Sequence, residues 1–237
     1  MAECRIELLH HFRLQLPDGS LEPGRPAQRL IAYLAVENRS HTRDHVAGSL
    51  WPDSTQARAT GSLRRVLCLL HANAPELIAR DGHTLTLSPH ADVDLWRQRL
   101  LIERVVAGES TSADREQLAL LRGDLLPDWD DAWLTPVRDE LRQLRLLCLE
   151  ALSVAQLDED KPHSALAIAL YATRDEPLRE SAHRLVVQAH IALGNHAAAA
   201  QHYADYSSLL WRELRLRPGL RMESLVRPLL STRDIAN

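Results

Sequence analysis

The residues with the clearest chemical potential lie between positions 58 and 65, where arginines interrupt an apolar pattern of helical spacing. A rotation of about 100° per residue, with Leu63 on the core side, turns Arg58 and Arg65 outward. Arginine can donate two hydrogen bonds to O6 and N7 of guanine, and Gly61 would let the helix approach a groove closely. The residues that we predict to contact base edges in the DNA major groove are Arg58, Ser62, Arg64 and Arg65. The competing interpretation is an ordinary solvated helix face.

Two smaller groups of polar residues could contact the DNA backbone. Thr42 and Arg43 open a predicted helix, where backbone N–H groups and a positive charge could hold a phosphate. Arg80, His83 and Thr84 surround a predicted hairpin tip, which could reach an adjacent minor groove or its phosphates. For both groups the alternative is a set of surface polar residues without a ligand.

Other chemistries lack their motifs. His41 and His45 have the i, i+4 spacing of helical metal ligands, but no Glu follows His41 and no third ligand is evident, so we expect a surface pair. Three acids, Asp128, Asp130 and Asp131, lack the glycine of a calcium loop and are interpreted as acids at a helix N-terminus. No phosphate-binding loop, nucleophile elbow or glycine-rich dinucleotide turn occurs. We expect no enzyme, no metal and no cofactor.

The composition is typical of a soluble globular protein that can bury a core. Of 237 residues, 45% are hydrophobic and 25% are charged. No apolar run approaches the roughly 20 residues that cross a bilayer, and no signal-peptide pattern opens the chain, so a cytoplasmic location without a membrane partner is expected. The three cysteines are far apart and are interpreted as buried thiols.

The charge is unevenly distributed along the chain. Residues 1–93 contain ten Arg and ten Asp or Glu, whereas the remainder has 18 basic and 22 acidic residues and carries the net charge of -4. A neutral domain can still bind DNA when its basic residues gather on one face. The net charge therefore neither supports nor excludes DNA binding.

The elements that position these residues follow the order of a winged helix-turn-helix. Strands are predicted within residues 4–16, and Pro17-Asp18-Gly19 should fold the chain back at Leu21. Three helices follow, which are predicted to begin near Pro26, at Thr42, and at Ser54 or Thr55. Residues 77–87 then contain Asp81-Gly82 between two β-rich segments, which predicts a hairpin. Residues 1–93 are therefore predicted to form a winged helix-turn-helix of response-regulator type, an α+β domain.

The remainder of the chain, residues 94–237, is predicted to be all-α and makes the whole protein mainly α. The expected helices cover about 94–107, 114–122, 131–157, 162–174, 178–193, 196–214 and 219–230. Trp129 and Trp133 are expected on one face of the long third helix, as packing residues.

A 34-residue period runs through this second region. The matching positions of its two copies are Asp160, Ala165, Ala169 and Pro177, and Gly194, Ala199, Tyr203 and Trp211. This is the tetratricopeptide period, in which small residues allow close helix packing and stacked helix pairs form surfaces for protein partners.

The order of these motifs resembles the Streptomyces antibiotic regulatory protein (SARP) type of activator, whose second half is a bacterial transcriptional activator domain. The residues that carry the resemblance are Gln28-Arg29-Leu30, Leu50-Trp51-Pro52-Asp53, Leu63-Arg64-Arg65, Asp92-Val93-Asp94, Leu126-Pro127, Trp129, Trp133, Arg138, Pro177-Leu178-Arg179-Glu180, Leu193-Gly194, Ala199, Tyr203, Leu214 and Arg217-Pro218. The resemblance implies a transcriptional activator that binds repeats in double-stranded promoter DNA and contacts RNA polymerase holoenzyme, often at secondary-metabolite genes.

One departure from the family changes the expected strength of DNA binding. Relatives carry further arginines in the last turns of the third helix, where this sequence has Cys68-Leu69-Leu70-His71. Fewer cations mean fewer phosphate contacts, so a homodimer on direct repeats would supply part of the affinity. The alternatives are an interaction scaffold whose winged domain has lost DNA binding, and a small-molecule sensor that uses the helical region.

Overall fold

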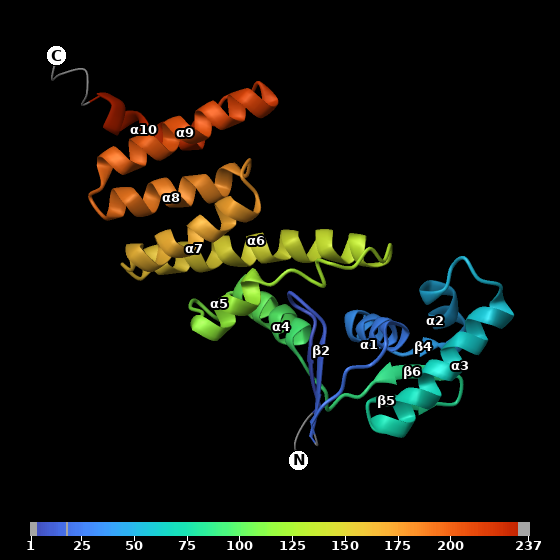
Figure 1. The fold of residues 1–237 in the computed structure, drawn as a ribbon. Coiled ribbons are helices and arrows are strands. Elements are labelled where there is room, and N and C mark those ends of the chain that lie inside the picture. Colours follow the sequence, from blue (N-terminus) through green and yellow to red (C-terminus); the bar gives the residue numbers. More distant parts are fainter. Residues whose placement is uncertain (1–3, 18, 232–237) are drawn as a thin grey trace. The chain divides into compact units, whose positions relative to one another are not determined.

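The computed structural model describes residues 4–17 and 19–231 (Figure 1). The chain forms two compact units. The first contains the described residues up to Leu100 and also Gly123–Asp139, whereas the second contains Leu101–Arg122 and the residues from Glu140 onward. The predicted division into residues 1–93 and 94–237 stays a prediction. The contacts add Gly123–Asp139 to the first unit, a segment that the sequence pattern did not associate with it.

The first unit contains two small sheets and three helices of its own. One sheet has the order β3-β2-β1-β7 and the other has the order β4-β6-β5. The strands are β1 (Arg5–Glu7), β2 (Arg13–Leu16), β3 (Gly19–Ser20), β4 (His41–Thr42), β5 (Ile78–Asp81), β6 (Thr84–Leu87) and β7 (Asp92–Val93). The helices are α1 (Arg25–Glu37), α2 (Arg43–Leu50) and α3 (Gln56–Asn73). This element order confirms the predicted fold class of the N-terminal part.

The local sequence explains where these helices begin. Pro26 lies in the first turn of α1, where a missing N–H is harmless. Thr42 caps α2, because its hydroxyl oxygen accepts a hydrogen bond of 3.3 Å from the backbone N–H of His45. Thr55 precedes α3 in an extended conformation. The apolar stripe predicted for α3 is buried at every position, Ala59, Leu63, Val66, Leu67 and Leu70.

The first predicted turn is confirmed and the second is shifted by one position. Leu16 pairs with Gly19 between β2 and β3, and the N–H of Leu21 donates to the carbonyl of Leu14 at 3.2 Å, so the chain folds back as predicted; Asp18 lies outside the described residues. Asp81 pairs with Thr84 in the hairpin, and Gly82 adopts a φ of 56°. The residues that make the turn are therefore Gly82 and His83, one position later than predicted.

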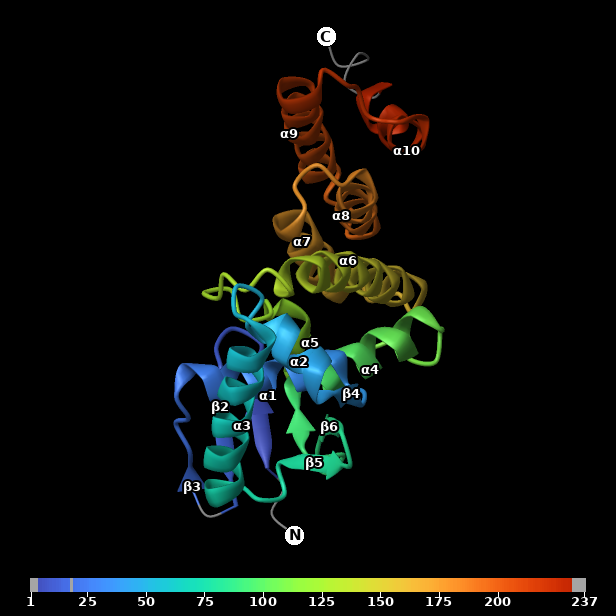
Figure 2. The ribbon, with the colours of Figure 1, turned by 90° about the vertical axis from the view of Figure 1, so that its right-hand side faces the viewer.

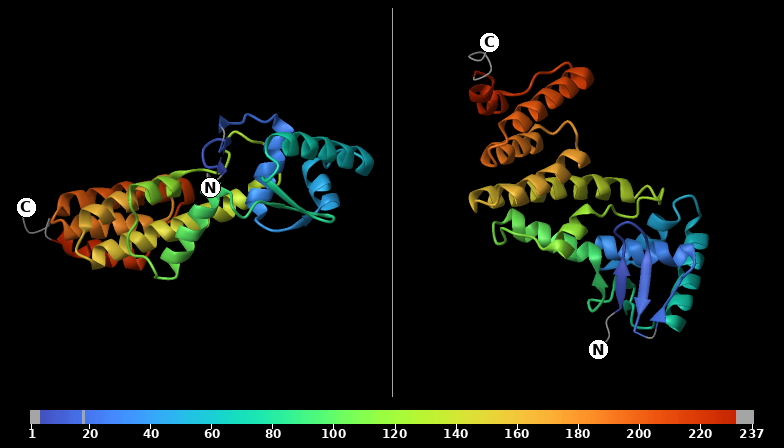
Figure 3. Two further views of the ribbon diagram at one scale, coloured as in Figure 1. Left: turned by 90° about the horizontal axis from the view of Figure 1, so that it is seen from below. Right: turned by 60° about the vertical axis from the view of Figure 1, so that its left-hand side comes forward.

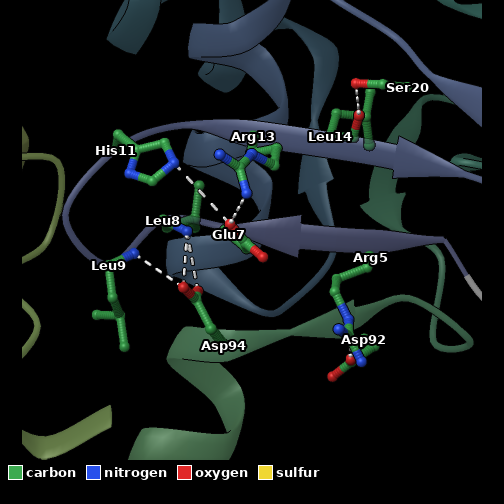
Figure 4. Close-up of polar contacts among 10 residues, drawn as sticks. All are labelled: Arg5, Glu7, Leu8, Leu9, His11, Arg13, Leu14, Ser20, Asp92 and Asp94. Atoms are coloured by element: carbon green, nitrogen blue, oxygen red, sulfur yellow. Dashed lines mark hydrogen bonds and ion pairs between the residues drawn. The ribbon is translucent and has the colours of Figure 1, made fainter. Parts of the chain in front are cut away.

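The side chain of Asp94 joins the N-terminal sheet to the start of α4 (Asp94–Val106). Its carboxylate accepts hydrogen bonds of 2.9 and 3.0 Å from the N–H of Leu8 and of 2.9 Å from the N–H of Leu9 (Figure 4). It also accepts from the N–H of Leu95 at 2.7 Å. Burial raises the pKa of Asp94, and these backbone donors oppose the rise. One buried carboxylate thus satisfies three backbone donors in the core of the unit.

The segment Gly123–Asp139 adds a second layer of contacts to this unit. The N–H of Leu126 donates to the carbonyl of Leu8 at 2.9 Å, and the N–H of His10 donates to the carbonyl of Asp124 at 2.7 Å. The guanidinium of Arg138 donates to backbone carbonyls of the same segment, those of Leu125, Leu126 and Trp129. Leu9 and Leu125 form an isolated β-bridge, so the expectation of no strand pairing beyond Val93 is wrong at this point.

Aromatic and charged side chains fix the same segment. Trp129 is 6% exposed, stacks on Phe12 at 6.0 Å between ring centres, and lies under the guanidinium of Arg25 at 3.6 Å. Asp131 forms ion pairs with Arg29 at 2.6 Å and with Arg25 at 3.4 Å. The carboxylate of Asp131 therefore binds arginines of α1, which corrects its interpretation as a helix N-terminal acid.

The two tryptophans also differ from expectation in their location. The long helix α6 spans Leu134–Asp158, so Trp129 and Trp133 both precede it and do not share one of its faces. Their packing role is confirmed, because Trp129 is buried and the Trp133 ring meets Tyr33 edge-on at 5.3 Å.

The second unit is a stack of helix pairs. Its helices, besides the later parts of α4 and α6, are α5 (Arg115–Arg122), α7 (Pro162–Asp175), α8 (Glu180–Ala192), α9 (His196–Leu214) and α10 (Leu220–Ser231). Figure 1 shows α7, α8 and α9 lying side by side in chain order. All seven predicted helices are present, so the all-α prediction for residues 94–237 holds apart from the bridge at Leu125. No helix of residues 4–17 and 19–231 is long and apolar enough to cross a membrane.

The 34-residue period has a structural counterpart. Asp160 and Gly194 occupy matching positions and both adopt the left-handed conformation, with φ of 57° and 72°. Each begins the turn that leads into the first helix of a pair, α7 or α9. Ala165 and Ala199 are fully buried at the next matching position. Aspartate thus replaces glycine in the first copy, because its short side chain tolerates this conformation.

A histidine pair, with His183 buried and His202 half-buried, connects α8 to α9. Nε2 of His183 lies 2.9 Å from the carbonyl of Pro177, so it must carry the hydrogen, and Nδ1 of His183 then accepts from Nε2 of His202 at 3.0 Å. Burial lowers the pKa of His202 to about 4, and His183 and His190 lower it further while Asp205 opposes them. Burial also lowers the pKa of His183. The pair is therefore neutral at pH 7.

Replacing Asp94 with alanine should destabilise the first unit by about 2–4 kcal/mol, because the N–H groups of Leu8 and Leu9 would be buried without an acceptor. Urea unfolding followed by circular dichroism measures the change. Asp92→Ala is the matched control, because Asp92 pairs with the partly exposed Arg5 and Arg97, and we expect it to cost less than about 1 kcal/mol. Equal losses for both variants would contradict the role assigned to Asp94.

The histidine pair predicts a loss of stability in acid. The unfolded histidines take up protons near their ordinary pKa of 6.5, whereas the folded pair resists protonation, so stability is complete above pH 6.5 and falls between pH 6.5 and about 4. We expect about 1–3 kcal/mol less at pH 5 than at pH 7 in urea titrations. His202→Gln, whose amide can still donate to His183, should show a smaller loss. An unchanged loss in this variant would show that other groups cause it.

Candidate nucleic-acid interface

The outer face of α3 is an exposed cationic surface of the first unit. Arg58, Arg64 and Arg65 are all exposed, and Ser62 is half-buried between them and the core side. A methyl group at Gly61 would have no neighbour within 4 Å, so the surface there is open. Figure 2 shows α3 extending along the outside of the unit. The predicted outward orientation is thus confirmed, whereas base contact stays a prediction.

The distribution of arginine partners distinguishes this face from the rest of the unit. Several arginines already bind carboxylates or carbonyls within the fold, and these are Arg5, Arg13, Arg25, Arg29, Arg39, Arg80 and Arg138. Within the described part of the first unit, the side chains of Arg43, Arg58, Arg64 and Arg65 have no hydrogen bond or ion pair. These four were all predicted as DNA contacts, and their guanidinium groups are available to an anionic ligand.

The start of α2 and the hairpin tip lie together. Thr42 pairs with Thr84 in the β4–β6 ladder, and the N–H of Arg43 donates to the carbonyl of His83 at 3.0 Å. The hydroxyl of Thr84 donates to the carbonyl of Asp81 at 2.9 Å. Most of the polar atoms expected to hold a phosphate therefore already have partners within the fold. The Arg43 side chain and the exposed ring of His83 are the groups left to contact a ligand.

Arg80 lies elsewhere. Its guanidinium donates to the carbonyl of Leu67 in α3 at 2.8 Å, so the side chain links the hairpin to α3. A second contact of this kind was not predicted: the amide of Gln56 donates to Asp44 at 3.1 Å and ties the start of α3 to α2. Figure 3 (left) shows α2 and α3 next to each other at one end of the unit, beside the hairpin. Neither contact has a local sequence pattern that would reveal it.

The last turns of α3 present a different surface. Leu69 is 59% exposed and Cys68 is exposed, which corrects the interpretation of that thiol as buried. Cys148 is buried, and Cys4 is half-buried. The outer face of α3 thus presents arginines as far as Arg65 and then Cys68 and Leu69.

The histidine pair near α2 is packed rather than ligand-binding. His41 is buried, which corrects its assignment to the surface, and its ring stacks on His45 at 4.9 Å. Nε2 of His45 lies 3.0 Å from the hydroxyl of Tyr33, and Nε2 of His41 lies 3.0 Å from Glu37. Burial lowers the pKa of His41. Among residues 4–17 and 19–231, no group of three or more His, Cys, Asp or Glu could hold a metal ion.

Comparison with known proteins identifies the second part of the chain and relates the whole to regulators. The family described as the bacterial transcriptional activator domain matches residues 93–230. Regulatory protein AfsR of Streptomyces coelicolor is 28% identical over 231 residues, which are 92% of this chain and 23% of that protein. Regulatory protein AfsR of Streptomyces griseus is 26% identical over 238 residues, which are 95% of this chain and 24% of that protein. The chain thus spans less than a quarter of these relatives.

A solved structure confirms the fold. The structure of Mycobacterium tuberculosis EmbR in complex with a low-affinity phosphopeptide has a TM-score of 0.76 and 20% identity, over 97% of this chain and 65% of that one. Together these matches confirm the resemblance to SARP-type activators that the sequence motifs indicated. The chain belongs to the bacterial transcriptional activator domain family, whose members are transcriptional regulators and not enzymes.

Proposed function

We propose that the protein is a sequence-specific DNA-binding activator that inserts α3 into the major groove at promoter repeats. The observation that carries the proposal is the gathering of the four unpartnered arginines of the first unit on α3 and at the start of α2, among the residues described. Arginines without an internal partner on a folded surface suit a polyanion. The family membership supports a role in transcription.

The geometry of α3 fits this role. Arg65 follows Arg58 by seven positions, and a helix rises about 1.5 Å per residue, so the two arginines lie about 10 Å apart along one face. A major groove about 12 Å wide admits such a helix, and its N-terminal residues would reach the base edges. Arg43 and His83, beside the start of α2, would then contact phosphates next to the groove.

The small number of cations favours two copies on DNA. Even if all four arginines contacted phosphates, the slope of log affinity against log salt would be no steeper than about -3.6, which is modest for a specific regulator. Two copies on adjacent direct repeats would double the phosphate contacts and raise the effective concentration. We therefore propose that a homodimer is the binding form.

The helical unit supplies the second half of the proposal. Stacked helix pairs offer a large surface to protein partners, and we propose that this surface contacts RNA polymerase holoenzyme. We propose secondary-metabolite genes as targets, because the SARP resemblance implies them, and the cytoplasm as the compartment, because the family acts in transcription.

The second half of α3 favours one alternative function. Exposed Leu69 and Cys68 could be covered by another protein, in which case the winged unit would act as an interaction scaffold without DNA binding of its own. The two functions differ in their response to promoter DNA.

Electrophoretic shifts with promoter DNA from beside the gene, at two salt concentrations, test the activator function. Arg65→Ala should weaken specific binding by about 1–3 kcal/mol, because one bidentate base contact is lost. Arg43→Ala should weaken binding to all sequences alike and reduce the salt slope by about 1, because a phosphate contact is lost.

Arg13→Ala is the control, since this arginine of β2 is paired with Glu7 and lies outside α2, α3 and the hairpin. We expect its affinity to match the parent protein. If the parent protein forms no salt-sensitive specific complex, alone or with polymerase, the scaffold function replaces the activator function.

A further inference from the structure

We propose that the last turn of α9 and the link to α10 form a docking site for an acidic amphipathic helix of a partner protein. We define this C-terminal patch by its apolar residues Trp211, Leu214, Leu216 and Leu220 and by its basic residues Arg212, Arg215, Arg217 and Arg221. The proposal concerns the second unit and does not depend on DNA binding by α3.

Large apolar side chains are unusually exposed in this patch. Trp211 and Leu214 are each 50% exposed, Leu216 is 56% exposed and Leu220 is 78% exposed. They fall within ten consecutive residues, whereas the other large exposed apolar residues of the described chain are dispersed over α3, α4 and α6. Single exposed apolar residues are common on protein surfaces, whereas a cluster of them indicates an interaction site.

The patch continues an internal packing seam. The face of α9 that packs on neighbouring helices includes Tyr206 and Leu210, which are buried against Met222 and Val226 of α10. Leu214 follows Leu210 by four residues, so it lies on the same stripe one turn further along, beyond the cover that α10 provides. A further helix laid along this stripe would extend the same core. Figure 1 shows α9 and α10 as the last layer of the helical stack.

The positive charge of the C-terminal patch favours a partner helix with acidic side chains. Residues 211–221 contain four Arg and one Glu, a formal charge of +3, although residues 94–237 together carry -4. Glu213 is already paired with Arg212 at 2.8 Å. Arg215, Arg217 and Arg221 are exposed and flank the apolar residues. A partner helix would match this surface with an apolar stripe flanked by Glu or Asp.

The backbone of the patch is already fixed in the free protein. Arg215 ends α9 in the left-handed conformation, with its N–H bonded to the carbonyl of Trp211 at 3.0 Å. The N–H of Gly219 donates to the Glu180 carboxylate of α8 at 2.7 Å, and Pro218 is buried. The cost of ordering the site on binding is therefore small.

These features favour a protein helix over other anionic surfaces. A nucleic-acid backbone would satisfy the arginines but would leave Leu214, Leu216 and Leu220 without apolar partners. A lipid surface would accept both kinds of side chain but has no shape that continues the stripe of Tyr206, Leu210 and Leu214. A helix meets both requirements.

Fluorescence anisotropy with the full chain tests the proposal. The probe is a fluorescein-labelled 17-residue peptide with Leu at helical i, i+3, i+4 and i+7 spacing and Glu at the flanking positions. We expect saturable binding that weakens with salt, and no comparable binding of a scrambled peptide or of the same Leu stripe flanked by Lys. Arg215→Glu with Arg217→Glu, and separately Leu214→Ser with Leu216→Ser, should each weaken binding about tenfold or more.

The control variant combines Arg104→Glu on α4 with Leu147→Ser on α6, where the side chains are also exposed. It should bind the Glu peptide within about twofold of the parent protein, and thermal unfolding should show all variants folded. Equal binding of the Glu, Lys and scrambled peptides, or unchanged binding by the patch variants, would overturn the proposal. Tighter binding to vesicles of phosphatidylcholine and phosphatidylglycerol, or to duplex DNA, lost in the Arg215 and Arg217 variant, would reassign the patch to lipid or nucleic acid.

Discussion

The Asp94 carboxylate lies where the winged fold meets the beginning of the activator domain, and the rest of the first unit depends on its backbone contacts. It receives the N–H groups of Leu8 and Leu9 just after β1 and begins α4. Two side chains further along α4 then cap the C-terminal end of α1. Trp96 and Arg99 donate hydrogen bonds to the carbonyls of Ala35 and Val36, at 2.7 Å each. Those carbonyls belong to the last turn of a helix and would otherwise lack partners. The start of α4 is thus part of the winged unit's core.

The first unit also depends on contacts from Gly123–Asp139, where the chain returns to it from the second unit. Trp129, Asp131 and Arg138 bind α1, Phe12 and the segment's own carbonyls, so residues of the matched activator domain complete the winged unit. The arginines used in this way, Arg25 and Arg29, are committed to the fold. A near-neutral unit can therefore still present a cationic helix face, because its structural arginines and its exposed α3 arginines are separate sets.

Much of this architecture follows from local sequence patterns, and the exceptions share one physical cause. The α3 stripe and the seven later helices were predictable because helical periodicity and capping residues act within a few positions. The left-handed Asp160 was recognisable only through its 34-residue offset from Gly194. The contacts of Asp94, Trp129 and Asp131 span 80 residues or more, so no local pattern encodes them.

At the candidate interface, the outward face of α3 was predictable from the helical rotation of about 100° per residue. The contact of Arg80 with α3 was not predictable. Arg80 donates to the backbone carbonyl of Leu67. Every residue has such a carbonyl, so the sequence does not show which one is the partner. The burial of His41 was missed because its i, i+4 spacing to His45 was interpreted as a surface pair, whereas its ring lies against Tyr33 and beside Glu37 at the end of α1.

Selection of binding sequences from random duplex DNA by the purified full chain tests the central claim most directly, because it requires no knowledge of the operator. The structure predicts enrichment of a guanine-containing element, repeated in the same orientation at about one helical turn, by the parent protein. A variant with Arg58, Arg64 and Arg65 replaced by alanine should enrich no element. Failure of the parent protein to enrich any element at low salt, or enrichment of the same element by the triple variant, would contradict the assignment of α3 as the DNA-reading helix.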